Sequence, residues 1–264
     1  MYRTITVVQD APEAEEPLGT KTKFWYGGRL SLFKAARRDT GEDWAEVVCA
    51  EIAGRLGLPH AEYELARWEG ASPPDKAFGV SSRNFLPHGA SLIPGNELLG
   101  QAEPAYLETK VSRFRVRDHT VERVIEVIRA IAAGIPPGWA APGGITDAVQ
   151  VFIGYLALDA LVGNTDRHNE NWGVIRMRDG AVHLAPTFDH ASSLCSHLRD
   201  EERRDRLDTK DKNRTSRRLR SRPLGASPHA SGRKAAFYKR GVSGGRTLRF
   251  RCSLAQCDRA ARSR

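Results

Sequence analysis

A polar segment that directly follows the most apolar stretch of the chain limits what this sequence can be. The apolar stretch covers residues 148–163, and positions 163–174 read Gly-Asn-Thr-Asp-Arg-His-Asn-Glu-Asn-Trp-Gly-Val. Asp166 precedes Asn171 by five positions in this segment, and a further acid, Asp189, follows a predicted hairpin. Phosphoryl transfer from ATP uses one carboxylate to orient or deprotonate the acceptor hydroxyl and two oxygen ligands to hold Mg²⁺ on the phosphates. The spacing therefore predicts this chemistry for Asp166, Asn171 and Asp189.

The first 86 residues predict a small strand-rich unit that contains one helix. Runs rich in β-branched and aromatic residues indicate strands, and apolar residues at helical spacing before Gly57 and Pro59 indicate a helix. Gly27 and Gly28 predict a two-residue hairpin turn, because glycine tolerates positive φ. The predicted strands cover residues 2–8, 21–26, 29–34, 61–68 and 76–86, and the predicted helix covers residues 42–58.

Lys34 is a candidate phosphate-binding residue. Leu30, Leu32 and Lys34 alternate along one predicted strand, so the lysine shares a face with two apolar residues. A lysine on such a face either contacts an anion or bends to water at the strand end. Glu46 and Glu51 of the following helix are both candidates for the carboxylate that pairs with a phosphate-binding lysine.

Residues 87–99 contain two prolines and two glycines, and they predict a turn-rich connection between two domains. Helical patterns resume beyond it, and the polar segment precedes a predicted hairpin with its turn at Asp179 and Gly180. Together with the strand-rich first part, this order predicts an α+β chain. The predicted helices cover residues 121–133 and 147–161, and the predicted hairpin strands cover residues 172–177 and 181–184.

These motifs resemble the HipA-like kinase family of bacterial toxin–antitoxin systems, and the Asp-Arg-His-x-x-Asn loop also resembles that of the phosphoinositide lipid kinases. The likeness covers residues 19–215 and includes Leu-Phe-Lys at positions 32–34 and Arg-Asn-Phe-Leu at positions 83–86. It implies a two-lobed, protein-kinase-like fold with a strand-rich, ATP-binding N-lobe at 1–86 and a mainly helical C-lobe at 87–213. It also implies an ATP- and Mg²⁺-dependent serine/threonine kinase with a protein substrate, and a helix-turn-helix antitoxin as a partner to test for.

The resemblance also implies roles for single residues. Asp166 would be the catalytic base or hydroxyl-orienting acid, and Lys34 the lysine that binds the ATP phosphates, with Glu46 at the family position of its partner. His168 would either donate to the transferring phosphate or brace the loop. The implied Mg²⁺ ligands are Asn171 and Asp189, the implied phosphate loop is Gly19, Thr20 and Lys21, and the implied adenine hinge is Asn84, Phe85 and Leu86.

Neighbouring charged residues suggest structural roles. Arg167 is expected to pair with a carboxylate such as Asp159 or Glu170, and residues 200–211 form a mixed charge run typical of a solvated helix face. The Arg-Asp-His string at 117–119 lacks a metal-binding residue five positions after its acid, so we expect a solvated helix start. His190 stands where an Asp-Phe-Gly motif has its glycine, a departure found in this kind of kinase.

The net charge of +9 comes from one end of the chain. Residues 214–264 hold 15 basic residues and one acid, whereas residues 1–213 hold 26 basic and 31 acidic residues, a net of −5. The basic segment has no amphipathic period, so we expect no stable packing there. It is either a foreign or frameshifted tail or an arm that binds nucleic acid, and nucleic-acid binding is expected only through it.

Other classes of protein are disfavoured. Four scattered cysteines indicate neither a disulfide framework nor a zinc site. Residues 148–163 are too short for a membrane span, and the first ten residues do not resemble a signal peptide, so we expect a cytoplasmic protein without membrane contact. Two alternatives to the protein kinase remain open: a catalytically impaired nucleotide- or partner-binding module with a truncated C-lobe, and a phosphoinositide-type lipid kinase.

Overall fold

The fold is seen in a computed structural model that describes residues 2–8, 14–15, 21–72, 76–102, 119–131 and 133–211. Gly19, Thr20 and the basic segment 214–264 lie outside these residues, as do the first two positions of the Arg-Asp-His string. Among the described residues, no helix is both long and apolar enough to cross a membrane.

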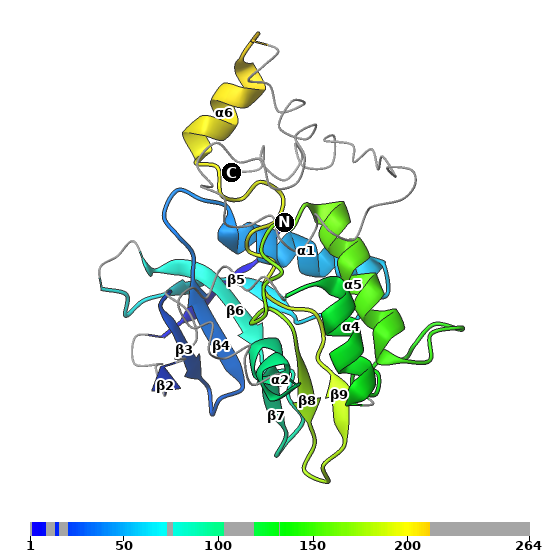
Figure 1. The fold of residues 1–264 in the computed structure, drawn as a ribbon. Coiled ribbons are helices and arrows are strands. Elements are labelled where there is room, and N and C mark those ends of the chain that lie inside the picture. Colours follow the sequence, from blue (N-terminus) through cyan, green and yellow to red (C-terminus); the bar gives the residue numbers. More distant parts are fainter. Residues whose placement is uncertain are drawn as a thin grey trace.

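The first part of the chain forms a six-stranded sheet with one helix against it (Figure 1). Neighbouring strands follow the order β1-β5-β6-β4-β3-β2, and only the β1–β5 pair is parallel. The strands are β1 (Thr4–Val7), β2 (Ala14–Glu15), β3 (Lys23–Tyr26), β4 (Ser31–Ala35), β5 (Tyr63–Trp68) and β6 (Phe78–Arg83), and the helix is α1 (Glu42–Arg55).

The two faces of this sheet have different roles. On one face, the buried rings of Phe24 and Phe33 pack against Trp68, and the Phe24 and Trp68 ring centroids lie 4.7 Å apart although two strands separate β3 from β5. On the opposite face, α1 packs its Val47 onto β5 and β6. Lys34 points to this second face, since it pairs in register with Val80, a member of the α1-packed cluster.

The second part of the chain is built around one apolar helix and a small sheet. The core joins the helices that begin at residues 95, 121 and 148 to the three-stranded antiparallel sheet β7-β8-β9. A further apolar cluster joins α1 to this part, because Cys49 and Ala53 pack with Leu158 and Val162. The elements are β7 (Ser91–Pro94), α2 (Gly95–Ala102), α4 (Val121–Ala130), α5 (Ala148–Val162), β8 (Gly173–Arg176), β9 (Val182–Leu184) and α6 (Asp200–Asp208).

Both ends of α5 are set by local sequence. At its start, the Asp147 side chain accepts a hydrogen bond from the Gln150 backbone N–H, and the Gln150 side chain bonds back to the Asp147 N–H, which makes a capping box. At its end, Gly163 adopts φ 65°, a left-handed conformation that favours glycine. The polar segment therefore leaves α5 in a fixed direction.

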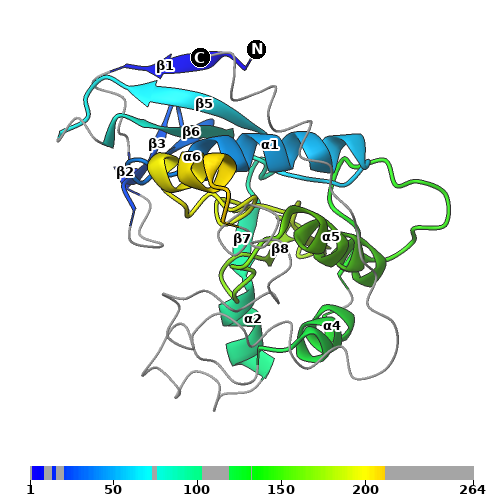
Figure 2. The same ribbon diagram turned by 90° about the horizontal axis from the view of Figure 1, so that it is seen from above.

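The mixed α+β character predicted from the sequence is confirmed, with differences at particular elements. The turn after β3 covers residues 27–30 rather than two glycines, since Arg29 also has a positive φ of 62° and Leu30 is exposed. The turn-rich connection predicted at 87–99 also contains regular elements that the sequence analysis did not expect: β7, whose four residues pair with β8, and the start of α2. The solvated helix predicted at 200–211 is confirmed by α6, which has no buried residue. Seen from above, it overlies the first part of α1 (Figure 2), where Arg203 lies over the Trp44 ring.

Candidate functional site

A group of three charges, two of them buried, forms where the two parts of the chain meet. The Nζ atom of Lys34 lies 2.8 Å from Oε1 of Glu46 on α1 and 2.6 Å from Oδ1 of Asp189. Lys34 and Glu46 are buried, and the side chain of Asp189 is 27% exposed. The structure thus brings Glu46, and not Glu51, to Lys34; Glu51 is exposed and pairs with Arg55.

The three charges shift one another's pKa values. Burial alone would lower the pKa of the Lys34 ammonium, but Asp189 and Glu46 outweigh burial and hold this pKa well above its ordinary value. Burial would likewise raise the pKa of Asp189, but Lys34 reverses the effect with help from Lys23 and Lys21, so this pKa lies below its usual range. Burial raises the pKa of Glu46, since Lys34 offsets only part of it.

Asp189 is held in place by its own backbone and by α1. The residue adopts φ 57°, in the left-handed region that non-glycine residues rarely occupy, and its N–H donates to the Tyr63 hydroxyl at 3.2 Å. The next N–H, that of His190, donates to Oε2 of Glu46 at 2.7 Å. Glu46 therefore uses one oxygen for Lys34 and the other for the backbone beside Asp189.

Arg167 ties the polar segment to the segment that carries Asp189. Its guanidinium makes two hydrogen bonds of 2.8 Å with the fully buried carboxylate of Asp159 on α5, which confirms one of the two carboxylates expected for it. The same guanidinium donates to the backbone oxygens of Asn171 and Phe188. One acceptor belongs to the predicted metal ligand Asn171, and the other belongs to Phe188, the residue before the predicted ligand Asp189. Arg167 therefore holds together the two segments that carry these ligands.

His190 completes this buried network. Its Nε2 lies 3.0 Å from Nη2 of Arg167 and 3.1 Å from the Thr187 hydroxyl. Burial, helped by the positive charge of Arg167, lowers the pKa of His190 to about 3. A neutral imidazole therefore accepts the hydrogen bond from Arg167, and this gives the side chain at the glycine position of an Asp-Phe-Gly motif a structural role.

Asp166 sits at the centre of the polar segment. Its N–H donates to Oδ1 of Asn164, and its carbonyl accepts from the Nδ2 atom of Asn171 at 2.8 Å. Its carboxylate accepts a hydrogen bond of 3.2 Å at Oδ2 from the hydroxyl of Ser192. Because the amide nitrogen of Asn171 is used by the loop itself, the amide oxygen is the atom that Asn171 can offer to a cation.

The donor set suits a hard cation. The described residues contain no group of three or more histidine, cysteine, aspartate or glutamate side chains that could hold a metal. The amide oxygen of Asn171 and the carboxylate of Asp189 are oxygen donors of the kind that Mg²⁺ takes together with phosphates and waters. The residues present therefore fit Mg²⁺ better than a metal that requires several nitrogen or sulfur ligands.

His168 lies inside the loop and braces it through one ring nitrogen. Its Nδ1 accepts a hydrogen bond of 3.1 Å from the Glu170 N–H. A neutral ring with an acceptor Nδ1 carries its proton on Nε2. Both roles expected from the sequence are therefore compatible with this ring: Nδ1 braces the loop, and Nε2 is a donor.

The remaining predicted residues are placed as follows. Lys21 makes an ion pair of 2.8 Å with Glu42 at the start of α1. Asn84 donates through Nδ2 to the Arg29 carbonyl and accepts from the Leu86 N–H, which fixes the bend after β6. The ring of Phe85 stacks on that of Phe188, with centroids 5.9 Å apart, directly beside Asp189.

The sequence interpretation missed two residues of this site. Lys23 pairs in register with Lys34, so both lysines face the same side of the sheet, and its charge helps to lower the pKa of Asp189. The alternation of basic residues at positions 21 and 23 was the available signal. Ser192 gave no signal in the sequence, because its hydrogen bond to Asp166 joins residues 26 positions apart.

His119 contradicts the solvated helix start expected for residues 117–119. Its ring is buried and accepts a hydrogen bond of 3.3 Å from Nε1 of Trp172. Burial is the main cause that lowers the pKa of His119 to about 3. The physical reason is the packing of the Trp172 ring into the core of the second part, which carries its polar edge to His119.

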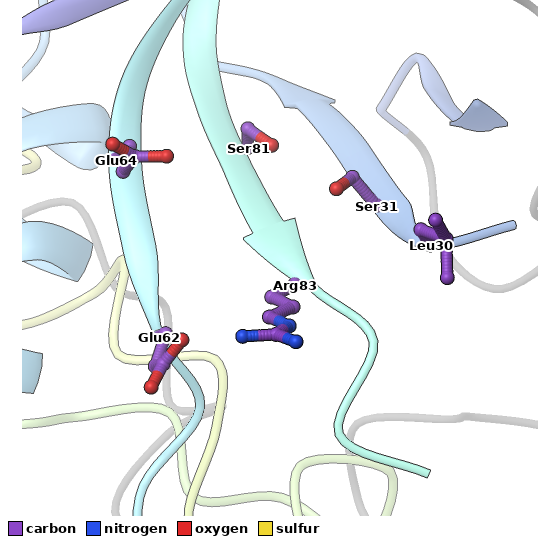
Figure 3. Close-up of a pocket in the computed structure, with 6 residues that line it drawn as sticks. All are labelled: Leu30, Ser31, Glu62, Glu64, Ser81 and Arg83. Atoms are coloured by element: carbon purple, nitrogen blue, oxygen red, sulfur yellow. The ribbon is translucent and has the colours of Figure 1, made fainter. Parts of the chain in front are cut away.

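A separate polar cavity of about 440 Å³ lies against the other face of the sheet (Figure 3). Ser31 and Arg83 pair in register there, as do Glu64 and Ser81, and Ser81 is also in register with Phe33. Since Phe33 and Lys34 are adjacent on one strand, they point to opposite faces. The cavity is therefore not part of the Lys34 site; its lining residues are Leu30, Ser31, Glu62, Glu64, Ser81 and Arg83.

Two solved structures resemble this chain. One is the crystal structure of a Helicobacter pylori proinflammatory kinase, CtkA, with a TM-score of 0.55, 23% sequence identity and coverage of 78% of this chain and 67% of that chain. The other is a Shewanella oneidensis MR-1 toxin–antitoxin system of HipA, HipB and operator DNA, with a TM-score of 0.46, 15% identity and coverage of 68% of this chain and 44% of that chain. The first likeness shows that this chain shares the fold of CtkA.

A comparison with curated proteins finds no match. The model of the HipA-like C-terminal domain matches residues 19–239. The likeness thus runs past Thr215, where the sequence interpretation ended it, and it includes the whole site described above. This chain belongs to the HipA-like C-terminal domain family.

Proposed function

We propose that this protein is an ATP- and Mg²⁺-dependent kinase that transfers the γ-phosphoryl group of ATP to a serine or threonine hydroxyl of a protein. The observation that carries the proposal is that carboxylates from two distant segments, Glu46 and Asp189, meet at the Lys34 ammonium, at 2.8 Å and 2.6 Å. Arg167 ties this group to the loop that holds Asp166 and Asn171. Membership of the HipA-like family supports the same reaction class.

Lys34 is the group that binds the ATP phosphates in this proposal. Its ammonium is buried between two carboxylates, so the three side chains together carry a net charge of −1 when all are ionised. Glu46 holds the ammonium from α1, and Lys23 and Lys21 add positive charge near Asp189. Asn171 and Asp189 would hold Mg²⁺, which neutralises the negative charge on the phosphate oxygens during transfer.

In this proposal, Asp166 orients the acceptor hydroxyl and accepts its proton. The hydroxyl donates its proton toward the Asp166 carboxylate as its oxygen attacks the γ-phosphorus, the bond between that phosphorus and the β–γ bridging oxygen breaks, and ADP leaves. The loop is held on both sides of this carboxylate, because Asn164 binds the Asp166 N–H and Asn171 binds its carbonyl. Such positioning supplies much of the rate enhancement in phosphoryl transfer.

The proposal extends to the organisation of the chain. Residues 1–86 would form an ATP-binding N-lobe and residues 87–213 a C-lobe with the catalytic loop and metal ligands. Asn84, Phe85 and Leu86 would contact adenine between the lobes, and the segment with Gly19, Thr20 and Lys21 would lie over the phosphates. A helix-turn-helix antitoxin is the partner that membership of this family suggests.

Incubation of the purified protein with labelled ATP, Mg²⁺ and a generic acceptor such as myelin basic protein tests the function. We expect labelling of the acceptor or of the chain itself, and a fall of at least ~10³ in rate for Asp166→Ala and Asp189→Ala. Asp208→Ala, on the solvated helix α6, is the matched control and should label like the wild type.

Other outcomes would contradict this function in distinct ways. Thermal stabilisation by ATP without any transfer would indicate a nucleotide-binding module. Preferential labelling of phosphoinositides over protein would indicate a lipid kinase. Equal labelling by the wild type and both aspartate variants would remove the assignment of the site.

A further inference from the structure

Ser192 is placed so that its hydroxyl contacts the side chain of Asp166. The Oγ atom of Ser192 donates to Oδ2 of Asp166 at 3.2 Å, from a position three residues after Asp189. An acceptor hydroxyl in the proposed reaction must approach the same carboxylate. The segment that follows Asp189 therefore places the Ser192 hydroxyl on the carboxylate that would also bind the hydroxyl of the acceptor.

Several contacts hold this hydroxyl in place. The Thr165 hydroxyl donates to the Ser192 carbonyl at 3.4 Å, and the Leu194 N–H donates to the Val162 carbonyl at 2.8 Å. Together with the bond from Ser192 to Asp166, these contacts join the segment after Asp189 to the end of α5 and the start of the loop. The Ser192 side chain is thus part of a fixed connection rather than an isolated surface contact.

The backbone around Ser192 adopts conformations that its residues do not favour. Leu194 has φ 54° and Cys195 has φ 59°, two consecutive non-glycine residues in the left-handed region, and Asp189 on the other side has φ 57°. Such conformations are energetically unfavourable for non-glycine residues, and they concentrate at functional sites. The strained backbone follows the path that brings Ser192 to Asp166.

We infer that Ser192 is a positioning residue for the transfer reaction: its hydroxyl fixes the rotation of the Asp166 carboxylate and so directs the other carboxylate oxygen toward the acceptor. The inference rests on the proposed kinase function and assigns a further residue to the same site. A hydrogen bond to one carboxylate oxygen restricts rotation about the Cβ–Cγ bond, so its loss widens the range of orientations that the Asp166 carboxylate adopts. Loss of the hydroxyl should therefore slow the transfer step and leave ATP binding unchanged.

The experiment compares four proteins with the wild type: Ser192→Ala, Ser192→Thr, Ser193→Ala and Asp166→Ala. We expect Ser192→Ala to lower kcat for transfer from labelled ATP to myelin basic protein by about ten- to a hundredfold, with the KM for ATP and the Tm unchanged. Ser192→Thr keeps a hydroxyl and should restore most of the rate. Ser193→Ala is the matched control, because the Ser193 hydroxyl is buried and makes no hydrogen bond with Asp166.

The outcomes separate this inference from the proposed function. An active wild type with an inactive Asp166→Ala and an unchanged Ser192→Ala overturns the role of Ser192 and leaves the kinase function intact. A Ser192→Thr protein as slow as Ser192→Ala also overturns it, as does a rise in the KM for ATP without a fall in kcat. A wild type that transfers no phosphate under any of these conditions overturns both.

Discussion

Removal of the Asp159 carboxylate from its buried ion pair with Arg167 should cost far more stability than the same change in an exposed pair of almost the same length. Asp159→Asn keeps the size of the side chain but removes its charge and turns an amide group toward the guanidinium. The exposed fractions of the two side chains are 0% for Asp159 and 2% for Arg167, so water cannot replace the lost carboxylate. Glu51→Gln is the matched control, because Glu51 and Arg55 are separated by 2.9 Å but are 48% and 75% exposed.

The expected magnitudes differ by about tenfold. Removal of one partner from a buried ion pair costs about 3–5 kcal/mol, since the remaining charge stays buried, whereas an exposed pair four residues apart on a helix contributes about 0.3–0.5 kcal/mol. The other acceptors of Arg167, which include the Phe188 carbonyl and Thr187 hydroxyl, recover part of the loss and place the cost near the lower end of the first range. With a urea m-value of about 2–3 kcal/mol/M, the midpoint should fall by about 1–2 M for Asp159→Asn and by ~0.2 M for Glu51→Gln.

Urea unfolding followed by tryptophan fluorescence measures these midpoints at pH 7. The proposed nucleotide site provides a second readout, because Arg167 holds the backbone of Asn171 beside that of Phe188. We expect Asp159→Asn to weaken ATP binding as well as stability. A midpoint for Asp159→Asn within 0.3 M of that for Glu51→Gln, on the order of 1 kcal/mol, would refute the argument from burial.

Three further predictions concern Glu46, His119 and Cys49. Glu46→Gln should slow phosphate transfer from labelled ATP by at least about tenfold, because it weakens the hold on Lys34, and Glu51→Gln should not; equal rates would contradict the pairing. Because burial lowers the pKa of His119 to about 3, the unfolded chain binds a proton below about pH 6.5 that the folded chain does not bind. Stability should therefore fall as the pH drops from about 6.5 toward 3, by up to ~1.4 kcal/mol per pH unit from this residue, and urea midpoints of His119→Gln should depend less steeply on pH. Burial raises the pKa of the Cys49 thiol to about 12, so iodoacetamide at pH 8 should label Cys49 only in denaturant. Detection of labelled Cys49 in the folded chain by mass spectrometry would contradict this.

The sequence predicted most of the elements that carry local patterns. The helix at 42–58 and the long apolar helix were found because their apolar residues repeat at helical spacing, and the structure places them at Glu42–Arg55 and Ala148–Val162. The strand β7 was missed because Pro94 and the glycines around it read as turns. Its strand character comes from pairing with β8, more than 70 residues away, which no local pattern contains.

The residues of the candidate site also divide into those with a local sequence signal and those without one. Spacing along the chain was sufficient to name Asp166, Asn171 and Asp189 as candidates, alternation along one strand named Lys34, and the resemblance then implied a role for each. The choice between two glutamates of α1 required the structure, because it depends on which face of the helix meets β4. Ser192 and the burial of His119 follow from contacts between segments far apart in the sequence, and these contacts leave no periodic signal.

The group around Lys34 also has a consequence for the order of folding. Its two ion pairs differ in sequence separation, since Glu46 is 12 positions from Lys34 whereas Asp189 is 155 positions away. At a synthesis rate of about 5–20 residues per second, these 155 positions take on the order of 10–30 s to be added. During that time the nascent chain can form the first pair but not the second, and the loop that carries Asp166 is added only shortly before Asp189. The proposed catalytic centre is therefore assembled late, when the segment around Asp189 docks onto a sheet that already holds the lysine.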